Sequence, residues 1–251
     1  GETFENLGSM HPDIHDMVFD INNSDIIYVG TDGGVYRTWN KGVTMEIVEN
    51  LPLSQFYHIS VDNEEPYNIY GGLQDNGVWM GPHNSTENKR WEMTGSYPWN
   101  EILGGDGMEI QIDKNQPNIV YTGYQFGSYF RLDLDKNKRT FIKPRHKLGE
   151  SPYRFNWQTP ILLSSHNQDI LYFGSNILHR SFNGGDNWQN ISPDLTKGGK
   201  PGNVPYGTIT TISESQNKFG LIYIGTDDGL IQVTKNGGSS WSRISDNLPQ
   251  D

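Results

Sequence analysis

The chain has 251 residues and a formal net charge of −11, with 29 glycines, 13 prolines and no cysteine. The lack of cysteine excludes disulfides, thiol nucleophiles and cysteine-ligated metals, and the negative charge argues against nucleic acid, whose phosphates it would repel. The sequence contains no run of roughly 18 apolar residues that could span a membrane.

The first seven residues look like the end of a repeated unit. The segment Gly1 to Leu7 aligns with Gly42 to Val48 and with Gly185 to Ile191, each of which we expect to leave a turn and enter a fourth strand. We therefore predict an additional N-terminal strand at Thr3 to Leu7. Because its companion strands are not in the sequence, we expect the chain to be part of a longer protein with further blades or domains.

Five units follow, and each contains a Tyr-x-Gly strand. Their tyrosines stand 42, 51, 51 and 51 residues apart: Tyr28, Tyr70, Tyr121, Tyr172 and Tyr223. A period of about 40 to 50 residues built from short strands and turns is typical of a β-propeller, a radial array of four-stranded sheets. We predict one all-β segment, 1–251, with five antiparallel four-stranded blades. Their expected limits are about 8–52, 53–95, 103–145, 155–196 and 204–248.

Two turn signatures recur within these units. A small polar residue stands eight positions before each repeat tyrosine and is expected to begin the turn between the first two strands: Asp20, Asp62, Asp113, Ser164 and Ser215. In addition, Ser181 to Trp188, Thr234 to Trp241 and the degenerate Thr38 to Met45 resemble the Asp-box. We interpret these boxes as structural, because turn chemistry accounts for each position.

Five parts of the chain resemble bacterial proteins with sortilin-type, Asp-box (neuraminidase-repeat) β-propellers, many of which bear the name glycosyl hydrolase. These parts are Leu53 to Gly77, Gly104 to Gly107, Arg154 to Ile161, His179 to Ser181 with Ile191 to Leu195, and Gly225 to Gly229. The match covers essentially the whole chain. The resemblance implies a long, multi-bladed bacterial protein that is secreted, periplasmic or on the cell surface.

The propeller geometry predicts where a ligand would bind. The connections into each first strand and those between second and third strands emerge on one face, where the sequence places aromatic, amide and charged residues that suit an extended glycan or peptide. The expected ligand-binding residues are Gln55, Tyr57, His58, Gln74, Asp75, Asn76, Trp99, Asp106, Arg154, Asn156, Trp157 and Tyr206. Any single aromatic residue among them could instead pack between blades. The predicted function is binding or scaffolding, without a cofactor or a metal site.

Two other functions remain compatible with the sequence. Thr31 to Arg37 resembles the catalytic segment of two-propeller endoglucanases that cleave xyloglucan with inversion, which makes Asp32 and Asp106 the candidate pair of a glycoside hydrolase. Inversion needs two carboxyl groups about 6.5 to 9.5 Å apart, and in that family the partner carboxylate comes from the second propeller. Asp227 stands in a turn equivalent to that of Asp32, which favours a turn role for both. The third possibility is a structural component of a bacterial surface complex.

Overall fold

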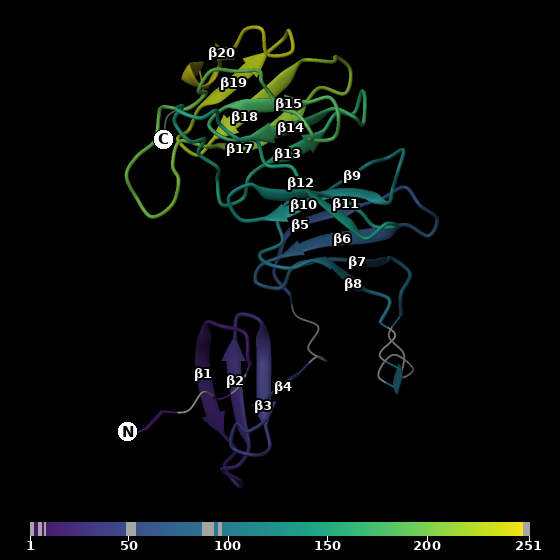
Figure 1. Cartoon of the computed structure of the whole chain (residues 1–251), viewed down its shortest axis with the longest axis vertical. Coiled ribbons are helices and arrows are strands. Elements are labelled where there is room, and N and C mark those ends of the chain that lie inside the picture. Colours follow the sequence, from purple (N-terminus) through teal and green to yellow (C-terminus); the bar gives the residue numbers. More distant parts are fainter. Residues whose placement is uncertain are drawn as a thin grey trace. The chain divides into compact units, whose positions relative to one another are not determined.

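The computed structural model describes residues 3–4, 7, 9–48, 54–86, 93–94 and 97–247. They contain five antiparallel sheets of four strands, each in sequential strand order (Figure 1). The chain divides into two compact units, Gly1–Ser54 with the first sheet and Gln55–Asp251 with the other four. The prediction of five four-stranded β-propeller blades is confirmed.

We name the sheets blades 1 to 5. Blade 1 consists of β1 (Ile14–Phe19), β2 (Ile27–Thr31), β3 (Gly34–Thr38) and β4 (Glu46–Ile47). Blade 2 consists of β5 (Phe56–Val61), β6 (Asn68–Leu73), β7 (Val78–Pro82) and β8 (Asn100–Leu103). Blade 3 consists of β9 (Gln111–Ile112), β10 (Ile119–Tyr124), β11 (Ser128–Asp133) and β12 (Lys138–Phe141). Blade 4 consists of β13 (Ile161–Leu163), β14 (Leu171–Gly174), β15 (Leu178–Ser181) and β16 (Gln189–Asn190). Blade 5 consists of β17 (Ile209–Glu214), β18 (Ile222–Thr226), β19 (Ile231–Thr234) and β20 (Ser242–Arg243).

The predicted limit of blade 2 at residue 95 is wrong. Its fourth strand is β8, in which Asn100 and Glu101 pair with Met80 and Trp79 of β7. Blade 2 has no Asp-box between its third and fourth strands, so no turn motif fixes the length of that connection. The fourth strand therefore lies farther along the chain than in the other blades.

The repeat tyrosines occupy equivalent places, as predicted. Each lies on the second strand and faces one residue of the first strand and one of the third, as Tyr121 does with Gln111 and Arg131. The polar residue eight positions earlier accepts a backbone N–H bond in all five hairpins: Asp20 from Asn22, Asp62 from Glu64, Asp113 from Asn115, Ser164 from His166 and Ser215 from Asn217. The turn between the first two strands is thus built by the same chemistry in every blade.

The three box segments share one hydrogen-bond network. In blade 5, the Thr234 hydroxyl accepts the N–H groups of Asn236 and Gly238 and donates to Asn236 Oδ1, which also accepts the N–H of Ser240. Gly238 has φ 96°, a left-handed conformation that favours glycine. The boxes that begin at Thr38 and Ser181 repeat these contacts. These contacts support the structural interpretation of the boxes.

Removal of one box hydroxyl should destabilise the second unit. Thr234→Val keeps the shape of this buried side chain but leaves two box amides without their acceptor, and we expect the free energy of unfolding to fall by roughly 1 to 3 kcal/mol. Urea denaturation followed by fluorescence measures the change. Lys235→Ala, at an exposed position in the same box, is the control, and equal stability of the two variants would contradict the structural role.

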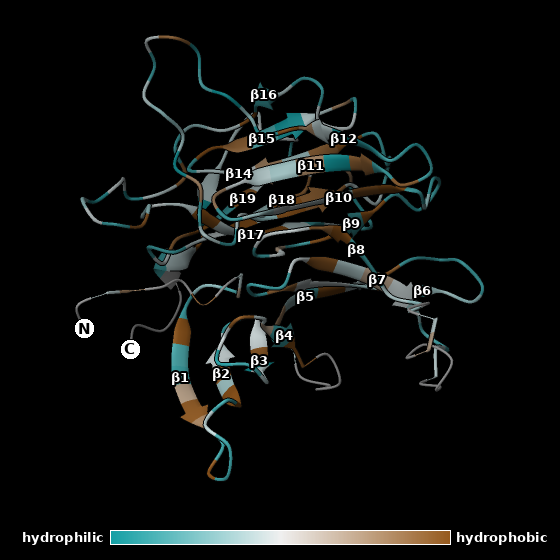
Figure 2. Cartoon of the chain, turned by 60° about the horizontal axis from the view of Figure 1, so that its bottom comes forward, coloured by the Kyte–Doolittle hydropathy of each residue, from teal (hydrophilic) through white to brown (hydrophobic). Residues whose placement is uncertain are grey.

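Blades 2 to 5 pack radially. Their first strands contact in the order β5, β9, β13 and β17, which places the first strand of each blade innermost. Near the fourth strands, Trp188 and Trp241 of the boxes also link neighbouring blades. Their indole N–H groups donate to the carbonyl groups of Ile142 and Ile191, respectively, in the preceding blade. Figure 2 shows apolar residues in strands such as β10 and β18 and many polar residues in the connections. The second strands, such as β10 and β14, carry much of the buried core.

Leu7 packs against blade 1 as part of a similar joint. A Cβ built on Gly42 would lie 2.5 Å from the Leu7 side chain, just as one on Gly185 would lie 2.8 Å from Ile142. The predicted N-terminal strand is described only at Thr3, Phe4 and Leu7, which carry no strand assignment; Glu5 and Asn6 lie outside the described residues. The described residues include no helix with the length and hydrophobicity of a membrane span.

Candidate ligand-binding face

Three aromatic side chains meet where blades 2, 3 and 4 approach one another. Trp157 lies in the connection into β13, Tyr57 on β5 and Phe126 in the turn between β10 and β11. The Trp157 indole N–H donates to the Tyr57 hydroxyl at 3.2 Å, and its ring meets the Phe126 ring edge-on with centroids 5.2 Å apart. All three rings are half-buried and pack on the core beneath. The structure therefore brings Tyr57 and Trp157, predicted separately, into one aromatic cluster.

Polar side chains next to this cluster cover the free inner edges of the first strands. His58 Nδ1 accepts the N–H of Ile110, and Ser60 donates to the Ile110 carbonyl group. Burial lowers the pKa of His58, so the neutral ring that accepts this bond is favoured. The backbone of Ile110, just before β9, is thus paired with side chains of the preceding blade.

Glu109 and Gln111 cover β13 in the same way. Glu109 Oε2 accepts the N–H of Ile161 at 3.3 Å, and Gln111 Oε1 accepts that of Leu163 at 3.3 Å. Burial raises the pKa of Glu109 to about 7, although the hydrogen bonds from Ile161 and Gln111 oppose that shift. The sequence analysis missed Glu109. Glu109 stands between the apolar residues Met108 and Ile110. This alternation is typical of a strand and is the pattern in the sequence that points to Glu109.

Asp106 joins two turns of the face. Its Oδ1 accepts the N–H of Asp75 at 2.9 Å and its Oδ2 accepts a bond from the Gln125 side chain. Asn76 donates to the Gln74 carbonyl group, and the Gln74 N–H in turn bonds the carbonyl of residue 55. Asp106 is only 8% exposed. Both carboxylate oxygens accept bonds from the protein, as expected of a structural residue.

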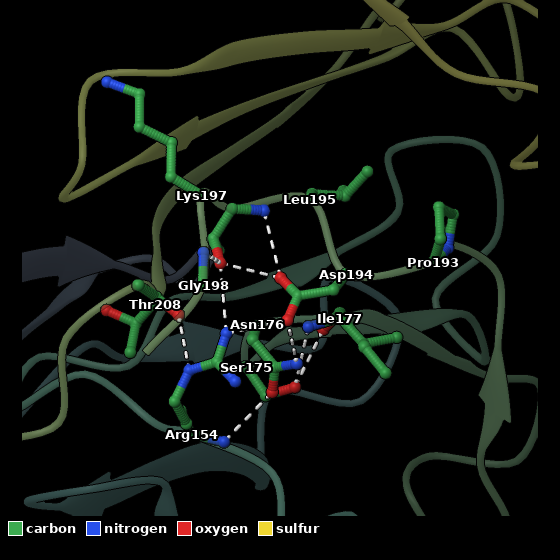
Figure 3. Close-up of polar contacts among 12 residues, drawn as sticks. Arg154, Ser175, Asn176, Ile177, Pro193, Asp194, Leu195, Lys197, Gly198 and Thr208 are labelled. Carbon is green, nitrogen blue, oxygen red and sulfur yellow. Dashed lines mark hydrogen bonds and ion pairs between the residues drawn. The ribbon is translucent and has the colours of Figure 1, made fainter. Parts of the chain in front are cut away.

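Arg154 and Asn176 tie three connections of blades 4 and 5 together (Figure 3). The Arg154 guanidinium donates to the Gly207 carbonyl, to Thr196 and to Asp194 Oδ2, the last at 2.7 Å, while Asn176 donates to the same carboxylate oxygen. Burial favours a higher pKa for Asp194, but hydrogen bonds from Thr196, Arg154 and Asn176 outweigh it and hold the pKa below its usual value. Arg154 therefore acts in a network that stabilises the connections.

Asn156 and Tyr206 lie in the same part of the face. Asn156 donates to the Thr208 hydroxyl at 2.9 Å and accepts the N–H of Gln158. The Tyr206 ring lies under the Lys200 ammonium group, 4.2 Å from its centroid. The amide of Asn156 is thus already bonded at both ends, whereas Tyr206 is half-buried and offers part of its ring.

The predicted placement of Trp99 on this face is wrong. Trp99 immediately precedes β8, and its indole N–H donates to the Ser85 hydroxyl, which lies just beyond the end of β7. Its ring also covers Gly81. Trp99 therefore lies at the opposite end of blade 2 from the connections that form the face. The error came from reading residues 97–100 as the exit from the fourth strand, when they are its entrance.

Asp32 belongs to the first unit and Asp106 to the second. His15 Nε2 bonds Asp32 Oδ1, and this contact raises the pKa of the exposed His15 imidazole. The equivalent Asp227 accepts the N–H groups of Gly207 and Thr208. An Asp at this position thus fixes the connection into the first strand in blade 5.

A serine, a histidine and an amide line up in blade 4. The Ser175 hydroxyl lies 2.8 Å from His179 Nε2, and His179 Nδ1 lies 2.8 Å from Asn190 Oδ1. However, Ser175 and His179 have no exposed surface, and burial lowers the pKa of His179 to about 4. Because the Ser175 hydroxyl is not accessible from solvent, we interpret the contacts as structural.

No family model and no curated protein sequence matches the chain. Among solved structures, it is similar to an ancestral GH74 enzyme (17% identity, TM-score 0.56, covering 94% of this chain and 32% of that one). It is also similar to the GH74 enzyme of Niastella koreensis (16%, 0.52, 93% and 38%) and to the extracellular domain of a one-component system from B. thetaiotaomicron (16%, 0.50, 92% and 27%). At these identities the likeness shows the fold alone, and the chain spans about a third of each structure.

Proposed function

We propose that the chain is a binding module of an exported bacterial β-propeller protein and that it recognises an extended glycan on the face around Trp157. The observation that carries this proposal is the cluster of Trp157, Tyr57 and Phe126, which three blades supply together. Half-buried aromatic rings beside fixed polar groups suit the apolar face and the hydroxyl groups of a sugar. Two matched structures named GH74 enzymes, and a third named an extracellular domain, support a glycan ligand and export.

A glycan and peptide array probed with the purified chain identifies the ligand, and Trp157→Ala tests the site. We expect this change to weaken binding by roughly 1 to 3 kcal/mol, because it removes the stacking surface. Isothermal titration with the array-selected glycan measures the effect. An extended peptide selected in place of a glycan would change the ligand class but not the site.

Two variants control this experiment. Tyr57→Phe removes the hydrogen bond to the indole but keeps both rings, so it should bind nearly as well as the wild type. Trp99→Ala removes a half-buried tryptophan at the opposite end of blade 2 and should leave the affinity unchanged. Loss of affinity in Trp99→Ala equal to that in Trp157→Ala would show a general structural effect and count against the proposal.

An inverting glycoside hydrolase is the second candidate function. It is favoured by the GH74 enzymes among the matched structures and by the hydrogen bond between Asp32 and His15. Under the binding proposal, Asp32→Asn keeps an acceptor oxygen and should leave affinity unchanged. Under the hydrolase alternative, the same change removes an acid or base and abolishes turnover. Reducing-sugar release by the wild type that disappears in Asp32→Asn would overturn the binding proposal.

A partner that co-purifies stably would instead favour a structural component of a surface complex.

A further inference from the structure

A cavity of about 270 Å³ opens between blades 2 and 3. One wall consists of Met80 of β7 and Asn100 to Ile102 of β8, and the other of the end of β11 and the start of β12. We call this cavity the furrow. The furrow lies at the end of the sheets where the third strand of a blade connects to the fourth. Trp157 lies at the opposite end, in a connection into a first strand. The furrow is therefore separate from the proposed glycan face.

At the next two joints, a tryptophan ring fills the equivalent place. Arg180 pairs with Gln189 in blade 4, and Arg131 pairs with Thr140 in blade 3, with the same number of residues between them. Arg139 of blade 3 therefore stands at the position of Trp188, which donates its indole N–H to a carbonyl group of the preceding blade. Trp241 makes the same contact in blade 5. Blade 3 has no Asp-box and no ring at this position, and the furrow is the space that remains.

The furrow has an apolar floor and a rim of charged residues, among them two cations. Met80, Ile102, Leu132 and Leu134 line it, and Leu132 is 2% exposed. At the rim, Lys138 and Arg139 are exposed and form no ion pair with any described residue. The remaining charges are Glu101 and Asp133, and Asp133 is already paired with Lys136 at 2.6 Å. An anionic group at this rim would therefore meet two cations that are not ion-paired with any residue of the described ranges.

Size and lining select the occupant. An apolar cavity of about 150 Å³ holds benzene in another protein, so the furrow has room for an indole or phenol ring. Its lining residues, all within the described part of the chain, include no aromatic side chain on which a sugar could stack. Among the described strands, β8 is also the last of its sheet, so its outer backbone edge is one to which an extended peptide could add. These features favour a peptide over a glycan.

We propose that the furrow binds a peptide segment of a partner protein, with an aromatic side chain inserted where the other joints hold their own tryptophan and an adjacent acidic residue paired with Lys138 or Arg139. The inserted ring would contact Ile102 and Leu132 and receive the Arg139 guanidinium over its face, a favourable cation–π arrangement. The joint between blades 2 and 3 is thus completed by a ring supplied from outside.

The test uses two blocked tripeptides, acetyl-Asp-Trp-Asp-amide and acetyl-Asp-Ala-Asp-amide, titrated by ligand-observed NMR against the whole chain. We expect the tryptophan peptide to bind at least about tenfold more tightly than the alanine peptide. Arg139→Trp places a tryptophan at the position that Trp188 occupies in blade 4. The new ring should fill the furrow, abolish binding of the tryptophan peptide and raise the melting temperature. Lys138→Glu changes an exposed residue and leaves the apolar floor intact, and it should weaken binding of the tryptophan peptide about tenfold. This variant keeps the test valid if Arg139→Trp fails to fold.

Matched variants locate the binding. Trp157→Ala should leave the affinity for the tryptophan peptide unchanged, which separates the furrow from the glycan face. Equal affinity of the two peptides would overturn the proposal, as would binding that persists in both Arg139→Trp and Lys138→Glu. Displacement of the tryptophan peptide by the glycan selected on the array would show a sugar site in the furrow and would overturn the proposal as well.

Discussion

Replacement of Gly107 by alanine is expected to lower the free energy of unfolding of the second unit by about 3 kcal/mol, at the upper end of overpacking effects. A Cβ on Gly107 would lie 2.1 Å from the Gly77 carbonyl oxygen and 2.9 Å from the Cα of Gly72. These are backbone atoms on two sides, so no side chain can turn aside to make room. Urea denaturation measures the loss. Because the Gly107 loop also carries Asp106 and Glu109, binding at the Trp157 cluster should weaken too.

Gly104→Ala is the matched control in the same loop. A Cβ there would meet only the end of the Glu101 side chain, at 3.3 Å, which can move. We expect this variant to lose well under 1 kcal/mol. If Gly104→Ala and Gly107→Ala were equally stable, the close approach of the loop to β6 would not be a feature of the folded protein.

Glu109→Gln is expected to make the protein more stable above pH 7 and to change little near pH 4. The pKa of Glu109 is raised from 4.5 to about 7 in the folded chain, chiefly by burial. The stability that its protonated form contributes is therefore complete below pH 4.5 and is lost as the pH rises through about 7. At about 1.4 kcal/mol for each pKa unit, the loss at pH 8 is at most about 3 kcal/mol. Glutamine carries no charge and avoids this loss.

Denaturant unfolding at several pH values between 4 and 8 tests this prediction. The difference between Glu109→Gln and the wild type should grow with pH and level off above pH 7. Glu150→Gln, a change at an exposed glutamate of the same unit, should follow the wild type throughout. Parallel curves for Glu109→Gln and the wild type would mean that Glu109 titrates as an ordinary exposed carboxyl group.

The parts of the fold that could be predicted are those determined by neighbours in sequence. The repeat tyrosines, the hairpin residues such as Asp62 and Ser164, and the box networks each depend on contacts within about ten residues of one another. The limit of blade 2 failed because its last connection lacks such a motif. Local turn chemistry thus accounts for the successes and for this failure.

The candidate site was less predictable, because its contacts join residues of different blades. Arg154 bonds Gly207 and Asn156 bonds Thr208, each more than 50 residues away, and Tyr57 meets Trp157 across 100 residues. Sequence patterns placed most of these residues on one face. They did not show that the polar groups of Arg154 and Asn156 are used within the protein.

The contacts that cover the first strands have a consequence for how the chain is assembled during synthesis. Ile110, just before β9, receives its partner from His58, and Ile161 of β13 from Glu109, so each of these two backbone N–H groups is paired by a side chain made earlier. During synthesis, the N-terminal parts of a protein generally fold first. When the first strands of blades 3 and 4 are made, these partner groups of the preceding blade are therefore already present. Translation order and docking order coincide from blade 2 to blade 4.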